Sequence, residues 1–307
     1  MKSPISFLLL SILFVTATDL QAQHGTVDNS SIVESDILDR DMSYSVYLPE
    51  SYHTSTRNYP VMYLLHGMTG DHNDWINLGE VHRIAGDAMA TGDAPEMIII
   101  MPDGLYDAFY INNYDGSINW EDFFHKEFIP EVESRYRVIG DRNTRAIAGL
   151  SMGGYGAMYH GINYKEKFSA IYAMSAAFLE VDPVTDEDER GDWDREFHKK
   201  TWGPLNDRGY PENYKEHSIQ EIFRAMELIE EEESPWMSNN GEVPLPAIFI
   251  DCGDDDFLLE ENFNLVNILN DKNVDFQFRV RDGGHTWEYW RTALEKTMVF
   301  IGDNFRN

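Results

Sequence analysis

A short serine-containing motif between a predicted strand and a predicted helix constrains this chain more than any other feature. Residues 147–156 read Ile-Ala-Gly-Leu-Ser-Met-Gly-Gly-Tyr-Gly and contain the pattern Gly-x-Ser-x-Gly at Gly149, Ser151 and Gly153. Glycines on both sides allow the sharp strand-to-helix turn that exposes a serine hydroxyl for nucleophilic attack. The motif therefore predicts an α/β fold with a nucleophile at Ser151.

Apolar segments with the periods of strands and helices alternate along most of the chain. The two segments nearest the start alternate in polarity, which predicts paired strands, whereas later strands are continuous apolar runs of the kind covered on both faces. One helical segment, residues 120–136, contains Pro130 and should kink or divide there. Such alternation predicts a largely parallel sheet with helices on both faces. The predicted strands span residues 27–38, 42–48, 60–65, 97–101, 144–149, 168–175, 246–251 and 275–280.

One segment, at about residues 179–243, breaks this alternation. It is acidic, contains tryptophan and includes a helical stretch over 218–232. We interpret it as an insertion over the carboxyl edge of the sheet, where ligands bind in such folds, within a single domain at 24–307. Its acidic runs at 180–194 and 230–233 lack the alternating spacing of a calcium loop, so a solvated acidic surface is expected and no metal site is predicted.

The first residues have the organisation of a secretory signal peptide. Lys2 is followed by an apolar run over 5–15 and by a small residue at Ala22, so residues 1–23 are assigned to the signal peptide. This run is too short to span a bilayer, and no other stretch approaches the roughly 20 apolar residues that a spanning helix needs. We therefore expect a periplasmic or secreted protein with no membrane partner. Cys252 is the single cysteine, so no intramolecular disulfide is possible.

The formal net charge of −30 limits the partners that the protein can have. A chain this acidic is repelled by nucleic-acid phosphates and by anionic membrane surfaces, so neither is expected as a partner. Its hydrophobic content of 42% is sufficient for a sizeable core. The sequence predicts no cofactor and leaves the oligomeric state open.

A serine nucleophile needs a base to take its proton and an acid to orient that base. The chain has ten histidines, and His285 is the one that lies after the last predicted strand. It stands in the loop Asp-Gly-Gly-His-Thr-Trp, in which two glycines allow the backbone to turn the imidazole toward the serine. We therefore expect His285 to be the base of Ser151.

The acid is expected in the loop after the strand at 246–251. This loop contains four carboxylates, those of Asp251, Asp254, Asp255 and Asp256. The base must be reached from a loop position, and Asp254, Asp255 and Asp256 all meet this condition. The residues alone therefore leave three candidates.

The negative oxygen that forms during attack needs two hydrogen-bond donors. The backbone N–H of Met152 follows the nucleophile at a helix N-terminus and is the first candidate. The second should lie in the loop after the strand at 60–65, where the N–H of Met68 is preferred and that of Gly67 is the alternative.

Aromatic and amide side chains near these loops are suited to a ring-shaped acyl group or a sugar. Trp75, Asn113 and Trp287 are the candidates for substrate contact. Residues of these types also pack in cores and on surfaces, which is the alternative for each of them.

With these residues in place, the chain resembles the esterase D-like branch of the α/β-hydrolases over nearly all of its length after the signal peptide. That branch includes feruloyl and acetyl esterases acting on plant polysaccharides, tributyrin-type esterases, S-formylglutathione hydrolases and mycolyltransferases. The resemblance implies an α/β-hydrolase fold with Ser151 as nucleophile and His285 as base. From the pattern Cys-Gly-x-x-Asp-x-Leu, it implies Asp256 as the orienting acid. It rests on the motifs at residues 64–68, 101–104, 148–157, 251–258 and 284–290.

The residues and the resemblance together predict a secreted serine carboxylesterase. Its expected partner is a small-molecule or polysaccharide acyl ester, such as a feruloyl or acetyl ester of hemicellulose. Export argues against S-formylglutathione, which is a cytoplasmic metabolite. The alternatives are acyl transfer to a sugar acceptor, hydrolysis of short-chain acyl or siderophore esters, and a non-catalytic binding protein on the same fold.

Overall fold

The computed structural model places most of the chain. The predicted signal peptide, residues 1–23, lies outside the described residues, and so does most of the two acidic runs. None of the helices in the described part is long and apolar enough to cross a bilayer. The residues that the structure describes are 24–106, 108–178, 183–184, 196–226 and 243–306.

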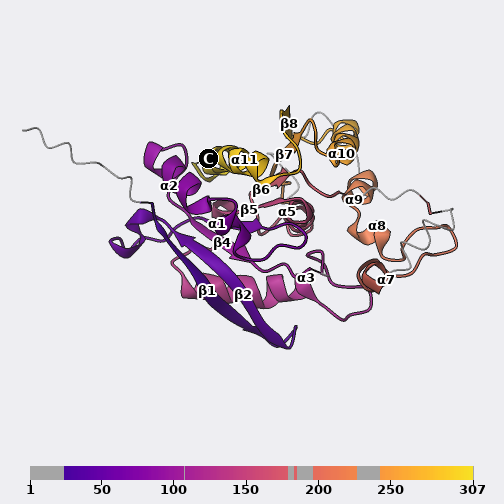
Figure 1. Cartoon of the computed structure of the whole chain (residues 1–307), viewed down its shortest axis with the longest axis horizontal. Coiled ribbons are helices and arrows are strands. Elements are labelled where there is room, and N and C mark those ends of the chain that lie inside the picture. Colours follow the sequence, from indigo (N-terminus) through magenta and orange to yellow (C-terminus); the bar gives the residue numbers. More distant parts are fainter. Residues whose placement is uncertain (1–23, 107, 179–182, 185–195, 227–242, 307) are drawn as a thin grey trace, which may run out of the picture.

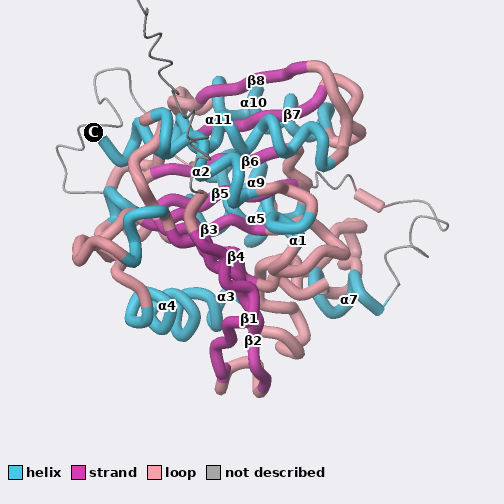
Figure 2. Tube along the Cα trace, turned by 60° about the vertical axis from the view of Figure 1, so that its left-hand side comes forward, coloured by secondary structure: helices cyan, strands magenta, loops and turns pink. Residues whose placement is uncertain are grey.

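Eight strands form one mixed sheet with the order β1-β2-β4-β3-β5-β6-β7-β8. β1 and β2 form an antiparallel pair, β2 is also antiparallel to β4, and every other neighbouring pair is parallel. Figure 2 shows the β1–β2 pair and β8 at opposite ends of the sheet. The predicted, mostly parallel α/β sheet is therefore confirmed. The strands are β1 (Thr26–Ser35), β2 (Arg40–Leu48), β3 (Val61–Leu65), β4 (Ile98–Pro102), β5 (Arg145–Leu150), β6 (Ala170–Met174), β7 (Ala247–Gly253) and β8 (Gln277–Arg281).

Helices cover both faces of the sheet. Successive residues of each strand point to opposite sides, so the apolar strands present apolar side chains on both faces. In β3, Met62 and Leu64 belong to the apolar cluster on one face, whereas Tyr63 and Leu65 belong to the cluster on the other. The helices on the first face are α2 (Val81–Thr91) and α11 (Trp287–Arg306), and those on the second are α4 (Ile129–Arg135), α5 (Met152–Asn163) and α10 (Leu259–Asp271).

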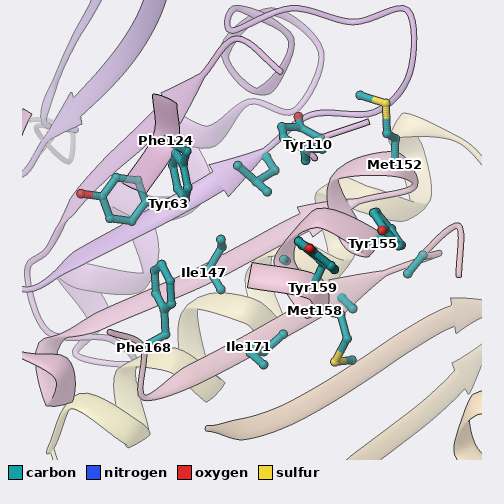
Figure 3. Close-up of a cluster of buried hydrophobic side chains, with 14 of the residues drawn as sticks. Tyr63, Tyr110, Phe124, Ile147, Met152, Tyr155, Met158, Tyr159, Phe168 and Ile171 are labelled. Atoms are coloured by element: carbon teal, nitrogen blue, oxygen red, sulfur yellow. The ribbon is translucent and has the colours of Figure 1, made fainter. Parts of the chain in front are cut away.

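The cluster on the second face is rich in aromatic rings. Figure 3 shows Tyr155, Met158 and Tyr159 of α5 in this cluster, together with Ile147 of β5 and Ile171 of β6. All of these side chains are buried. Close packing of this kind fixes α5 against the sheet, and its first residue directly follows the Gly-x-Ser-x-Gly turn.

Pro130 divides the helical segment predicted at 120–136. The short helix α3 (Trp120–Phe123) is followed by a π-helical turn, η2 (Phe124–Phe128), and α4 begins at Ile129 with Pro130 in its first turn. A proline has no N–H to donate, and its ring crowds the carbonyl one turn earlier. A wider turn at this place relieves the clash.

The described part of the predicted insertion contains short helices joined by loops, and it lies on one side of the molecule (Figure 1). Tyr155, in the first turn of α5, donates a hydrogen bond to the backbone oxygen of His217 at 2.7 Å. The ring centre of Trp202 lies 5.4 Å from that of Phe109 and 6.1 Å from that of Tyr155. These contacts place the insertion against the N-terminal end of α5, at the carboxyl edge of the parallel strands. The helices are α7 (Glu196–Trp202), α8 (Tyr214–His217) and α9 (Ile219–Ala225).

A buried carboxylate joins the elements at the β8 end of the sheet. Asp251 in β7 is fully buried and accepts hydrogen bonds from the hydroxyls of Tyr172 in β6, at 2.7 Å, and Tyr289 in α11. Arg279 of β8 forms an ion pair with the same carboxylate, and Arg281 lies 3.4 Å from it. Because a buried charge is costly without partners, these groups hold three strands and α11 in one arrangement.

We expect Asp251→Asn to lower the free energy of unfolding by about 2 kcal/mol, because the two arginines would then face a neutral group. Urea denaturation monitored by tryptophan fluorescence measures the change. Lys126→Ala is the control, since Lys126 pairs with Asp122 at 2.8 Å on the exposed surface, where ion pairs contribute little. An Asp251→Asn protein as stable as the wild type would contradict the role assigned to this carboxylate.

Candidate active site

The Gly-x-Ser-x-Gly motif forms a strained turn between β5 and α5. Ser151 has a φ of 54° and a ψ of −119°, a conformation that residues with a Cβ rarely adopt. A Cβ on Gly149 would lie 2.2 Å from the backbone oxygen of Gly153, and one on Gly153 would lie 2.5 Å from that of His66. Both glycines are therefore required by the close approach of the backbone, which explains the spacing of the motif.

Backbone hydrogen bonds hold this turn in place. The N–H of Ser151 donates to the oxygen of Met174 at 2.9 Å, and the N–H of Ala177 donates to the oxygen of Ser151 at 3.0 Å. Met174 is the last residue of β6, and Ala177 lies in the segment that follows it. The end of the neighbouring strand therefore binds both the N–H and the C=O of Ser151. The hydroxyl consequently has a rigid position at the carboxyl edge of the sheet.

Three side chains from separate loops meet at this position. His285 Nε2 lies 3.0 Å from Ser151 Oγ, and His285 Nδ1 lies 3.1 and 3.0 Å from the two carboxylate oxygens of Asp256. An ionised carboxylate only accepts, so Nδ1 carries the proton and Nε2 is free to accept the serine proton. The arrangement can activate a serine, because nucleophile, base and orienting acid form one hydrogen-bonded chain.

The environment of Asp256 keeps its carboxyl group ionised. Its side chain is fully shielded from solvent, and this burial raises its pKa. Hydrogen bonds from His285 and from the N–H of Leu258, the latter at 2.9 Å, lower the pKa by more, so that it lies below its ordinary value. The group is therefore charged at neutral pH and can orient the imidazole.

The neighbouring carboxylates have other partners. Asp251 belongs to the buried network that joins the strands. Asp254 accepts a hydrogen bond from the N–H of Gly283 at 3.0 Å and so holds the loop that carries His285. Asp255 is exposed, and its N–H donates to the oxygen of Gly283 at 3.0 Å. Tertiary contacts thus give different partners to aspartates that the sequence alone does not distinguish.

Two aromatic rings lie against the imidazole of His285. The ring centre of Trp290 is 4.9 Å away, and that of Phe257 is 4.7 Å away. Trp290 is buried, whereas Phe257 is 72% exposed, more than any other large apolar side chain in the described part of the chain. An apolar ring that borders the base and also faces solvent is available for contact with a substrate.

The loop after β3 borders the nucleophile. A Cβ on Gly67 would lie 3.4 Å from the Cβ of Ser151, and Met68, with a 39% exposed side chain, follows Gly67 in this loop. Met152 is the first residue of α5, where backbone N–H groups have no partner within the helix. Met68 and Met152, the two predicted oxyanion donors, therefore stand on separate segments that both border Ser151.

His66 and Tyr110 fix the start of the same loop. His66 Nδ1 lies 2.8 Å from the oxygen of Gly67, and its Nε2 accepts from the N–H of Gly104 at 2.8 Å. A carbonyl only accepts, so Nδ1 carries the proton and the imidazole is neutral. Burial lowers the pKa of His66, which favours the same neutral form. The hydroxyl of Tyr110 donates to the backbone oxygen of His66 at 2.8 Å.

The three residues predicted to contact substrate lie in different environments. Trp75 is 1% exposed and its indole N–H donates to the oxygen of Leu65 at 3.0 Å, so this prediction is wrong: the side chain packs in the core. Asn113 is 5% exposed, and its Nδ2 donates to Ser117 Oγ at 3.3 Å within its own loop. Trp287 is only partly buried, packs on Trp75 at 5.3 Å between ring centres, and keeps some surface for a ligand.

The sequence motifs do not single out Phe257 as a site residue, and they do not predict which groups His66 contacts. A signal exists for Phe257, which is an apolar residue in a run of acidic ones and directly follows the predicted acid. No comparable signal exists for His66, because its partner Gly104 is 38 residues away along the chain.

Cys252, in β7, is a buried thiol close to this site. Burial raises its pKa to about 12, so the thiol stays protonated at neutral pH and is not a nucleophile. Over the described residues, no three or more histidine, cysteine or acidic side chains are grouped so that they could hold a metal ion.

Comparison with known proteins relates this site to a family. The family model named Esterase matches residues 35–301. The chain belongs to the esterase family. The esterase is 27% identical to an acetyl esterase from Caldicellulosiruptor saccharolyticus, over 80% of this chain and 84% of that protein. It is 34% identical to a solved ferulic acid esterase, with a TM-score of 0.75 over 92% of this chain and 99% of that one.

A further relative of the esterase is named for acyl transfer. It is the diacylglycerol acyltransferase/mycolyltransferase Ag85B of Mycobacterium avium, which is 26% identical over 76% of this chain and 72% of that protein. Together the relatives confirm the predicted α/β-hydrolase fold of the esterase. They also show that it is a carboxylic ester hydrolase.

We expect Asp256→Asn to lower kcat/KM by about 10⁴-fold in a protein that remains folded, because an amide favours the wrong imidazole tautomer. Initial rates on an activated acetate ester, with circular dichroism to check folding, measure the effect. Asp255→Asn is the matched control, since it removes an exposed carboxylate one position away and should retain the wild-type rate. Equal losses in the two variants would rule out Asp256 as the specific partner of the base.

Proposed function

We propose that the protein is a secreted serine carboxylesterase that hydrolyses acyl esters of carbohydrate, such as the feruloyl or acetyl esters of hemicellulose. The observation that carries this proposal is the hydrogen-bonded chain of Ser151, His285 and Asp256, in which the base lies 3.0 Å from the nucleophile. Similarity to an acetyl esterase and to a ferulic acid esterase supports the choice of ester.

In the first half of the proposed reaction, Ser151 Oγ attacks the ester carbonyl while His285 Nε2 takes its proton. Asp256 accepts a hydrogen bond from Nδ1 and stabilises the imidazolium that forms. The carbonyl oxygen becomes an oxyanion and accepts hydrogen bonds from the N–H groups of Met68 and Met152. Collapse of this intermediate passes the proton from His285 to the leaving alcohol and leaves the acyl group on Ser151.

In the second half, a water molecule takes the place of the alcohol beside His285. The imidazole removes a proton from the water as its oxygen attacks the acyl carbonyl, which forms a second tetrahedral intermediate. Its collapse releases the carboxylic acid and restores the serine hydroxyl. No cofactor takes part in this scheme.

The surroundings of the base support an alcohol that contains a ring. The leaving oxygen must come within hydrogen-bonding reach of His285 Nε2, and the exposed ring of Phe257 lies 4.7 Å from that imidazole. An apolar ring at this place suits the C–H face of a sugar. Trp287, whose ring centre lies 5.2 Å from that of Trp290, extends the aromatic surface.

Export is part of the proposal. Residues 1–23 have the charge and the apolar run of a signal peptide, which supports a periplasmic or secreted location. A polysaccharide substrate is met outside the cytoplasm, whereas S-formylglutathione is not. The net charge of −30 argues against nucleic acid and against anionic membranes as partners.

Transfer of the acyl group to a sugar is the second candidate, and the 26% identity to a mycolyltransferase supports it. The acylation half would be the same, and a sugar hydroxyl would take the place of water. The ratio of free acid to acylated sugar, measured with a sugar acceptor present, distinguishes the two reactions.

We expect the wild type to release ferulate or acetate from feruloylated, acetylated arabinoxylan, and Ser151→Ala to release neither. Alanine removes the nucleophile and retains a Cβ at the strained position, so the variant should fold normally. Chromatography of the products quantifies ferulate and acetate separately. Ferulate would indicate a pocket for an aromatic acyl group, and acetate alone would indicate a small acyl pocket.

Two outcomes would contradict the proposal. A wild type that releases neither product but hydrolyses an activated acetate ester would exclude xylan esters as substrate. Turnover by Ser151→Ala, with contamination excluded, would contradict the serine mechanism itself.

We expect Phe257→Ala to lower kcat/KM by about 5- to 10-fold on feruloylated arabinose and by less than about twofold on methyl ferulate. The two esters share the acyl group and differ in the alcohol, so only a contact on the alcohol side separates them. Phe263→Ala is the control, because Phe263 is an exposed ring on α10 that packs on Phe278. Equal losses on both esters would mean that Phe257 supports His285 instead.

A further inference from the structure

Ser175 follows β6 in a backbone conformation that glycine adopts far more readily. Its φ is 43°, and the residue is fully buried. β6 lies between β5, which leads to the nucleophile, and β7, which leads to the acid. The N–H of Ser175 donates to the oxygen of Asp251 in β7 at 2.7 Å. A glycine would avoid the strain, so a serine at this position indicates a use for its hydroxyl.

The hydroxyl of Ser175 is ordered by Trp290. Trp290 Nε1 lies 3.2 Å from Ser175 Oγ. An indole N–H only donates, so Oγ accepts this hydrogen bond and its single proton remains to be donated elsewhere.

The fold places this hydroxyl in the cluster around the acid. Ser175 is bound to Asp251, which directly precedes Cys252 in β7, and Trp290, which binds its Oγ, packs on the imidazole that contacts Asp256. Asp256 and Cys252 are the titratable groups that interact with this hydroxyl. Burial raises the pKa of Cys252 to about 12, so the thiol keeps its own proton and is a weak acceptor. The carboxylate is ionised, and hydrogen bonds to charged acceptors are the stronger ones. Of the two, Asp256 is therefore the better acceptor for this proton.

Trp290 also contacts the other partner of this carboxylate. Its ring lies edge-on to the imidazole of His285, with 4.9 Å between ring centres and an angle of 87°. One indole therefore packs on the base and also orders the hydroxyl that binds the acid. Trp290 and Ser175 are both buried, so their effect on the reaction must pass through Asp256 and His285.

We propose that Ser175 is a positioning residue for Asp256, to which its hydroxyl donates a hydrogen bond. Trp290 orders the donating hydroxyl. His285 and the N–H of Leu258 supply the other hydrogen bonds to this carboxylate. The inference rests on the Ser–His–Asp mechanism proposed above.

Removal of the hydroxyl has a defined effect on the pH dependence. A carboxylate that loses a donor becomes more basic, so the pKa of Asp256 rises. The more basic carboxylate holds the Nδ1 proton of His285 more tightly and stabilises the imidazolium, which then forms at a higher pH. Since the neutral imidazole is the base, the acidic limb of kcat/KM moves to higher pH.

The other titratable and charged groups near this pair are unchanged by the substitution. On β7 they are Cys252, whose thiol stays protonated over the range, and Asp251, which is paired with Arg279 and Arg281 of β8. In the loop, Asp254 is exposed and is bound to the N–H of Gly283. A shift of the acidic limb is therefore assigned to Asp256 and its base.

The test is the pH profile of Ser175→Ala on an activated acetate ester, with kcat and KM measured separately. We expect kcat to fall about 3- to 10-fold, the acidic limb to move up by about half a pH unit, and KM to stay within about twofold. Trp290→Phe keeps a ring against His285 but removes the N–H, and it should move the limb in the same direction. Ser169→Ala, which alters a serine at the other end of β6 that donates to a backbone oxygen, is the matched control and should behave as wild type.

If Ser175→Ala does not fold, the same pH profile is measured on Ser175→Gly, because glycine adopts this backbone conformation readily and also lacks the hydroxyl. An acidic limb that is unchanged in the Ser175 variant and in Trp290→Phe would overturn the inference, even if the rate falls. Turnover by Ser151→Ala would overturn the proposed mechanism and this inference together. An inactive Ser151→Ala beside an unchanged Ser175 profile would overturn this inference alone.

Discussion

The strained turn at Ser151 is the constraint on which the rest of the site depends. A serine with a φ of 54° is possible here because Gly149 and Gly153 let the backbone segments approach, and because the end of β6 binds the peptide on both sides. The packing of α5 in an aromatic-rich core offsets the strain. The serine hydroxyl therefore has a fixed position, toward which the side chains of His285 and Asp256 are directed from other loops.

The aspartates of β7 and of the loop after it differ in their surroundings and not in residue type. Asp251 meets two tyrosine hydroxyls and two arginines, and it joins neighbouring elements. Asp256 lies further along the same segment, meets an imidazole, and is kept ionised by hydrogen bonds. The same side chain joins strands and a helix in one case and binds the imidazole of His285 in the other, because different strands and helices supply its partners.

Local patterns predict most of the fold, and they fail where the outcome depends on distant contacts. The strand predicted at 168–175 is β6, which ends at Met174 because the backbone of Ser175 turns into the left-handed region. Trp75 resembles a ligand-binding residue by its place in a segment predicted to be a loop, yet it lies in the short helix α1 (Asp74–Asn77) and is enclosed by the sheet and α11. Phe257 resembles a core residue by its type, yet it is exposed because the loop that carries it turns Asp256 inward. The roles of the site residues stay predictions until the variants are measured.

By itself, the sequence determined the serine turn, the alternation of strands and helices, and the presence of a histidine after the last strand. Each of these is a local pattern, written in residues that are neighbours along the chain. Only the tertiary structure decided which loop aspartate meets His285, which aromatic ring faces solvent, and which buried hydroxyl lies behind the acid. Those outcomes depend on which side chains become buried and on hydrogen bonds between segments that are distant in sequence. Only folding brings these segments together.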